Sequence, residues 1–188
     1  MKKRQSGFTL IELLAGILIT GVLLAALYYV FTSQQQAFSA QEQVAEMNQN
    51  VRAALDLMTR EIRLAGYKNS TGTFNGIQTA SANSIEVLAD LNQDGSTSGP
   101  NEDITYTYNP GTLQIWRNDV TLPVADNITN LSFSYTLADG SVTATPSNPA
   151  NIRKVTITIT ARTTYPDRSG VYRTVTLNTD VTPRNLAL

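Results

Sequence analysis

The 188-residue sequence contains no cysteine and no histidine. Without cysteine it can form no disulfide, no thiolate zinc site and no thiol nucleophile. Without histidine it lacks the usual general base near neutral pH and the commonest metal ligand. The chain also has no large excess of either charge, because it contains 14 Lys+Arg and 15 Asp+Glu. No overall positive field therefore attracts nucleic acid. Catalysis would then need a serine–lysine pair or a carboxylate pair, and no such motif stands out. We therefore expect a protein that is not an enzyme.

A long apolar stretch occupies residues 8–31, with the sequence FTLIELLAGILITGVLLAALYYVF. At about 24 residues it would form roughly 36 Å of helix, enough to cross a bilayer core of about 30 Å. The basic residues Lys2, Lys3 and Arg4 precede it, which predicts a cytoplasmic N-terminus and an external C-terminal part. A secretory signal would have a shorter apolar core. A plain anchor leaves Glu12 unexplained, since a carboxylate within a membrane helix costs roughly 3 kcal/mol.

The residues around Glu12 carry a family resemblance. Residues 7–14 (GFTLIELL), behind the basic triplet, resemble the prepilin processing signal of type IV pilins and type II secretion pseudopilins. The resemblance implies that residues 1–7 are a leader, that a prepilin peptidase cuts after Gly7, and that Phe8 is then N-methylated. It also implies that Glu12 meets the terminal amine of a neighbouring pilin, where each charge relieves the other's cost of desolvation.

The same resemblance implies a location. The precursor is expected in the bacterial inner membrane with its C-terminal domain in the periplasm, and the mature chain in a filament or filament tip at the cell surface. The expected partners are the prepilin peptidase, the membrane and the N-terminal helices of other pilins.

The predicted helix continues beyond the membrane segment. Hydrophobic residues recur every three or four positions at Val44, Met47, Val51, Leu55, Met58 and Ile62. This spacing forms one apolar stripe of an amphipathic helix. Gly66 is a natural stop. We expect one helix over residues 8–65. It includes a membrane segment (8–31), and its amphipathic continuation, counted with the stop residue Gly66, covers residues 32–66.

The remaining residues, 67–188, form short alternating segments typical of β-strands. The predicted strands are residues 84–88, 104–108, 113–117, 120–124, 131–135, 154–162 and 171–181. Asn109 to Thr112 is typical of a hairpin turn, and residues 138–151 of a loop. Strict alternation predicts antiparallel sheets with one covered face. The sequence therefore predicts an α+β fold, in which the long helix packs on a β-rich domain.

A finer resemblance lies in the C-terminal part. The segments EIRLAGY (61–67), DLNQDG (90–95) and PRN (183–185) are similar to minor pilins of the PilW type and to J-type minor pseudopilins. Type IV pili and type II secretion systems both use such subunits, and the two alternatives stay open on the sequence.

An acidic loop offers a candidate calcium site. Asp90, Asn92 and Asp94 before Gly95 match the first half of an EF-hand loop, whose oxygen ligands suit Ca²⁺. The twelfth position is Asn101, where the EF-hand has a bidentate Glu, so Glu102 or Asp103 would have to supply the late ligand. Asp, Asn and Gly are equally typical of a solvated turn. The two interpretations are weighted alike, and any calcium here would be structural.

A binding pilin for DNA uptake or adhesion is the alternative from another functional class. DNA binding would need a clustered basic face with aromatic residues. The candidates are Arg153, Lys154, Arg162, Arg168 and Arg173. The nearly neutral net charge argues against a strong nucleic-acid surface, so a structural filament subunit is the favoured prediction.

Overall fold

The structure is a computed structural model that describes residues 7–68 and 72–186. The chain divides into two compact units, the first ending at Glu42 and the second being Gln43–Leu188. Most of the predicted leader, residues 1–6, lies outside the described residues. Each unit is described by itself.

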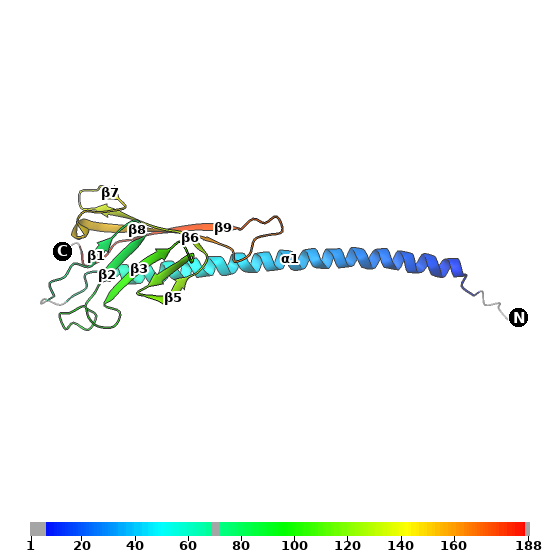
Figure 1. The fold of residues 1–188 in the computed structure, drawn as a ribbon, viewed down its shortest axis with the longest axis horizontal. Helices are drawn as coiled ribbons and strands as arrows, with labels where there is room; N and C mark the ends of the chain where they lie inside the picture. The colour runs from blue at the N-terminus through cyan, green and yellow to red at the C-terminus, as the bar shows by residue number, and fades with distance from the viewer. Residues whose placement is uncertain (1–6, 69–71, 187–188) are drawn as a thin grey trace. The chain divides into compact units, whose positions relative to one another are not determined.

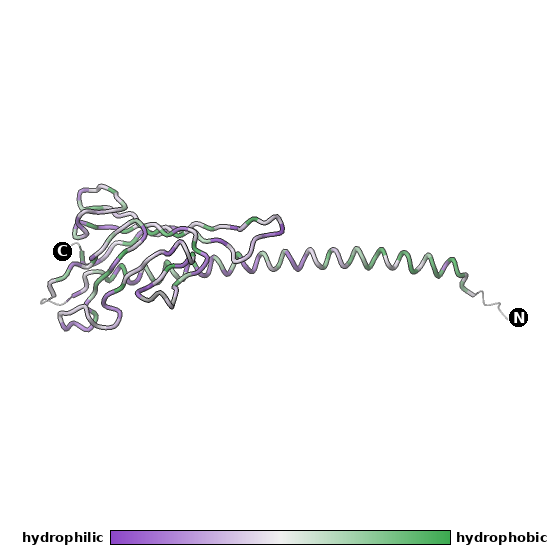
Figure 2. The backbone as a smooth tube through the Cα atoms, viewed as in Figure 1, coloured by the Kyte–Doolittle hydropathy of each residue, from purple (hydrophilic) through white to green (hydrophobic). Residues whose placement is uncertain are grey.

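The long helix α1 (Leu10–Arg63) runs through the first unit and into the second. The large apolar side chains between Phe8 and Phe31 are all exposed, and this part of the helix is the most hydrophobic segment in Figure 2. The helix is long and apolar enough to cross a membrane. It ends just before Gly66, whose φ of 77° a residue with a Cβ rarely adopts. The long N-terminal helix is confirmed, with each end two residues inside the predicted range.

The second unit contains two antiparallel sheets (Figure 1). The first has five strands in chain order: β1 (Ile77–Ala80), β2 (Ser84–Leu88), β3 (Asp103–Asn109), β4 (Gln114–Arg117) and β5 (Asp119–Ala125). The second has the order β7-β6-β8-β9, formed by β6 (Ile128–Leu137), β7 (Val142–Thr143), β8 (Ile152–Arg162) and β9 (Thr174–Val181). A short 3₁₀ helix, η1 (Pro149–Asn151), precedes β8. The predicted α+β class is confirmed.

One hydrophobic core joins the last part of α1 to both sheets. The helix contributes its buried stripe of Met47, Val51, Ala54, Leu55, Met58 and Ile62. Along β8 every second residue from Val155 to Ala161 is buried in the same core. The helical period of 3.6 and the strand period of 2 therefore turn the apolar residues predicted from the sequence toward a single interior.

Backbone hydrogen bonds at two glycines connect the C-terminal end of α1 to the first sheet. The Gly66 N–H donates to the Leu88 carbonyl, and the Leu88 N–H donates to the Gly76 carbonyl, both at 2.9 Å. A Cβ added to Gly76 would lie 2.2 Å from the Gly66 nitrogen. The absence of a side chain at Gly76 is therefore what lets the two backbones meet.

Candidate functional site

The start of α1 holds the residues expected to take part in processing and assembly. Phe8 is 88% exposed, and Gly7 is exposed beside it. Oε2 of Glu12 accepts hydrogen bonds from the Thr9 backbone N–H at 2.9 Å and from the Thr9 hydroxyl at 2.8 Å. Thr9 Oγ1 in turn accepts from the Glu12 N–H at 3.4 Å. This reciprocal pair is a capping box, which satisfies backbone donors at the helix start.

A groove on the first unit adjoins Glu12. Its volume is about 450 Å³, and Gly16, Thr20 and Gly21 line it together with larger apolar residues. A Cβ added to Gly16 or Gly21 would meet nothing within 4 Å, and the Thr20 hydroxyl donates to the Gly16 carbonyl at 2.8 Å. Small residues let the backbones of neighbouring membrane helices approach closely. This face of the helix therefore suits a helical neighbour.

The acidic loop between β2 and β3 is built around two buried carboxylates. Asp90 is 0% exposed and Glu102 is 2% exposed. Asp90 accepts backbone N–H bonds from Asp94 at 3.1 Å and Gly95 at 2.9 Å. Glu102 accepts them from Leu91, Asn92 and Gly99 at 3.0, 3.1 and 2.7 Å. Backbone donors thus compensate both buried charges and hold the loop in shape.

The five predicted calcium ligands differ in burial and in the contacts that they make. Asn92 and Asp94 are exposed and bond to each other, with 3.0 Å between Asn92 Nδ2 and Asp94 Oδ2. Asp103 begins β3 and is exposed, on the opposite side of the backbone from its neighbour Glu102. Among the described residues no group of three or more acidic side chains could hold a metal ion. Calcium binding at this loop stays a prediction of the sequence.

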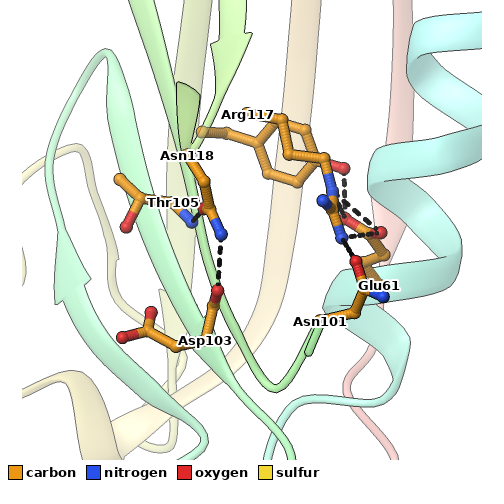
Figure 3. Close-up of polar contacts among 7 residues, drawn as sticks. Glu61, Asn101, Asp103, Thr105, Arg117 and Asn118 are labelled. Atoms are coloured by element: carbon orange, nitrogen blue, oxygen red, sulfur yellow. Dashed lines mark hydrogen bonds and ion pairs between the residues drawn. The ribbon is translucent and has the colours of Figure 1, made fainter. Parts of the chain in front are cut away.

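A second cluster ties α1 to the first sheet (Figure 3). Arg117 on β4 reaches Glu61 on α1, with Nη2 2.9 Å from Oε1 and Nε 3.1 Å from both carboxylate oxygens. The Tyr106 hydroxyl on β3 donates to Oε2 of the same carboxylate. Arg117 Nη2 also donates to Asn101 Oδ1 at 2.8 Å. Side-chain exposure is only 22% for Arg117 and 15% for Glu61, so the pair is largely shielded from water.

The surroundings of this cluster shift the pKa values of its members. Burial and the hydrogen bond to Glu61 raise the pKa of Tyr106 far above its usual value. The hydrogen bond to Glu61 also raises the pKa of Arg117. Both residues therefore keep their protons across the physiological range. The arrangement is a set of hydrogen bonds that joins three elements, α1, β3 and β4.

Asn118 supports the same end of the β3–β4 pair. Its φ is 58°, and its side chain bridges toward β3, with Oδ1 2.5 Å from the Thr105 nitrogen and Nδ2 2.7 Å from the Asp103 carbonyl oxygen (Figure 3). Partial burial and the nearby Glu86 raise the pKa of the Asp103 carboxyl. These contacts extend the ladder between β3 and β4, so Asp103 belongs to the sheet and not to the loop.

Two family models match this chain, one at its N-terminus and one over most of the remaining residues. Residues 2–28 match the prokaryotic N-terminal methylation motif. Residues 40–182 match the family described as prepilin peptidase-dependent protein B. The chain belongs to this family. No curated protein matches it.

Membership in the prepilin peptidase-dependent protein B family confirms the pilin-like character predicted from the sequence. Processing by a prepilin peptidase follows from the family and the motif together. The sequence reasoning missed the cluster of Glu61, Tyr106 and Arg117. A signal was present, because Glu61 follows Met58 by three positions and so lies near the buried side of the helix.

Proposed function

We propose that the chain is a minor pilin of the PilW type, which enters a type IV pilus and helps to prime its assembly. The observation that carries this proposal is the pairing of a methylation motif over residues 2–28 with a prepilin peptidase-dependent family match over residues 40–182. Cleavage after Gly7 and N-methylation of Phe8 would release a subunit whose helix begins beside Glu12. The carboxylate of Glu12 would then pair with the terminal amine of a neighbour.

The proposed route begins in the inner membrane and ends in the filament. The apolar part of α1 anchors the precursor, and the second unit faces the periplasm. In the filament the same part of the helix packs against other subunits, with the groove beside Gly16 and Gly21 as a contact face. The chain is in this account a substrate of the peptidase and not a catalyst.

The decisive measurement of processing is the mass of the mature N-terminus. A chain that starts at methylated Phe8 supports the proposal, and a chain that keeps its leader refutes it. Gly7→Ala should block the cut and leave the longer precursor. Normal maturation of that variant would contradict the assigned cleavage position.

Deletion of the gene separates the pilus from the J-type pseudopilin alternative. A minor pilin deletion should abolish pili while leaving export of folded proteins intact. Loss of export with normal piliation would instead assign the chain to a type II secretion system.

A further inference from the structure

The loop between β8 and β9, residues 163–173, collects exposed cationic and aromatic side chains (orange in Figure 1). Arg168 and Arg173 are exposed. So are Tyr165 at 68%, Val171 at 58% and Tyr172 at 37%. Arg162, the last residue of β8, places its guanidinium 4.2 Å from the centre of the Tyr172 ring.

The loop is held in shape by its own hydrogen bonds. The Asp167 carboxylate accepts from the backbone N–H groups of Ser169 at 2.9 Å and Val171 at 3.1 Å. The Thr163 hydroxyl is buried and donates to the Tyr165 carbonyl at 2.9 Å. A surface that is already ordered loses little conformational entropy when it binds a partner.

Within the described part of the chain, the arginines of this loop form no ion pair with an acidic side chain. The ion pairs found within residues 7–68 and 72–186 are Arg117–Glu61 and Lys154–Asp180. Nε of Arg162 is buried and makes no hydrogen bond with any described residue. Glu46 and Asp126 line a groove with Arg162, but neither pairs with it. The carboxylate within the loop, Asp167, is engaged by its own turn.

The loop contacts the first residue of the second unit, which follows the apolar part of α1 in the sequence. The Tyr165 N–H donates to Gln43 Oε1 at 3.0 Å, and Gln43 is the first residue of the second unit. Residues 32–42 alone separate Gln43 from the apolar segment. Even fully extended, they span no more than roughly 40 Å. Gln43, and the loop bonded to it, therefore stay within roughly 40 Å of the end of the apolar segment.

We propose that the loop over residues 163–173, together with Arg162, docks on the anionic phospholipid headgroups of the membrane that holds α1. Guanidinium groups match phosphate in geometry and charge. Tyrosine suits the interface between water and lipid, because its ring is apolar and its hydroxyl is polar. Each arginine near an anionic surface strengthens binding about fivefold. The contact holds the second unit against the membrane until the subunit enters the filament.

A single-stranded nucleic acid is the competing ligand, because arginine and aromatic residues also bind bases. Two observations favour the membrane. Two of the basic residues predicted as a nucleic-acid face already have partners within the chain. Lys154 pairs with Asp180 at 2.9 Å, and Arg153 donates to the carbonyls of Ala150 and Ile152. The exposed Val171 also has no face that stacks on a base.

The test places a probe on the loop of the full-length chain. Because the sequence has no cysteine, a cysteine introduced as Ser169→Cys carries the only thiol label. The labelled chain is reconstituted in vesicles of phosphatidylcholine alone or of equal parts phosphatidylcholine and phosphatidylglycerol. Quenching of the label by brominated lipid reports its contact with the bilayer. The matched variants are Arg168→Gln with Arg173→Gln, and, as a control at exposed arginines elsewhere, Arg60→Gln with Arg184→Gln.

Strong quenching in the phosphatidylglycerol vesicles is expected, with loss of quenching in phosphatidylcholine, in high salt and in the Arg168/Arg173 variant. Removal of those two arginines should weaken docking roughly 25-fold, and the control should change little. Equal quenching in both lipids, or no effect of the Arg168/Arg173 change, would overturn the proposal. So would binding of single-stranded DNA through these arginines without lipid contact.

The inference rests on the proposed membrane anchoring, and the two can fail separately. Flotation of the reconstituted chain with the vesicles reports the anchor. A chain that floats without quenching contradicts only the docking, whereas a chain that does not float contradicts both.

Discussion

At the scale of single residues, Glu12 would have two partners under the proposed function, Thr9 of its own chain and the amine of a neighbour. In the isolated chain both of its hydrogen bonds from Thr9 reach Oε2, so Oε1 can meet a neighbour's amine. The capping box lowers the cost of carrying the carboxylate into an apolar environment before assembly, because the charge already accepts two hydrogen bonds. The helix cap and the intermolecular pair are therefore compatible.

Glu12→Ala should be cleaved and methylated normally yet enter filaments poorly, since the amine of the neighbour would be buried without a counter-charge. Immunodetection of the subunit in sheared pili measures this. Thr9→Val is the matched control, because it removes the capping hydroxyl and keeps the carboxylate. Full incorporation of the Glu12→Ala subunit would contradict the pairing role.

The Glu61 cluster makes a second prediction for single residues. Glu61→Gln should lower the free energy of unfolding by about 2 kcal/mol, since a shielded Arg117 loses its counter-charge. Tyr106→Phe should cost about 1 kcal/mol. Urea unfolding of the chain without its membrane segment measures both. As a control, Lys154→Gln breaks an ion pair exposed by 40% and 55% and should have a clearly smaller effect, because water screens it. Equal effects of Glu61→Gln and Lys154→Gln would contradict this account.

At the scale of elements, the loop between β2 and β3 depends on its two buried carboxylates. Glu102→Gln replaces one acceptor oxygen by a donor that faces backbone N–H groups. The free energy of unfolding should therefore fall by about 1–3 kcal/mol, and the melting temperature should fall with it. Asp94→Asn, at an exposed position, should have a smaller effect. If the loop holds calcium, as its sequence predicts, the melting temperature should be higher with calcium than with a chelator. Coincident melts would leave the loop as an ordinary turn.

The elements could be predicted where a period was visible. The stripe from Val44 to Ile62 predicted the buried face of α1, and alternation predicted β8 nearly to the residue. The two short strands β1 and β7 were missed, because four and two residues show no period. Residues 171–173 alternate like a strand, yet β9 begins only at Thr174. The Thr163 N–H bonds to the Arg173 carbonyl at 2.8 Å as part of the turn.

The chemistry of the sites was predictable only where it is local in sequence. The processing signal lies in one segment, so residues 7–14 were enough to indicate it. The partners Glu61, Tyr106 and Arg117 come from three elements, and only the fold brings them together. The acidic loop was only partly predictable for a related reason. Its spacing suits a cation, but the bonds from the Leu91 and Asn92 N–H groups to Glu102 join residues ten or eleven positions apart, which the pattern alone does not show.

At the scale of the whole molecule, two buried tyrosines should make the stability of the second unit depend on pH in the alkaline range. Burial raises the pKa of Tyr106 and of Tyr135 far above the usual value, while the unfolded chain ionises near pH 10. Above that pH the folded state holds more protons than the unfolded state, so stability should fall as pH rises. Below it this contribution is fully present. The expected slope is about 1.4 kcal/mol per pH unit for each tyrosine.

Urea unfolding between neutral and strongly alkaline pH measures this slope. Tyr106→Phe should reduce it, and Tyr165→Phe, at an exposed ring, should leave it unchanged. An identical slope in the Tyr106→Phe protein would show that other groups control alkaline unfolding.

The contact between Gly66 and Gly76 also limits which sequences can encode this protein. A Cβ at position 76 would lie 2.2 Å from the Gly66 nitrogen and 2.5 Å from the Gly66 Cα. These are backbone atoms, which cannot rotate out of the way as the end of a flexible side chain can. In a saturation library selected for folded protein, position 76 should keep glycine alone. Gly111, whose added Cβ would meet only Asn109 Oδ1 at 3.1 Å, should accept alanine. Drift in this lineage can therefore remodel the loops while the joint between helix and sheet stays fixed.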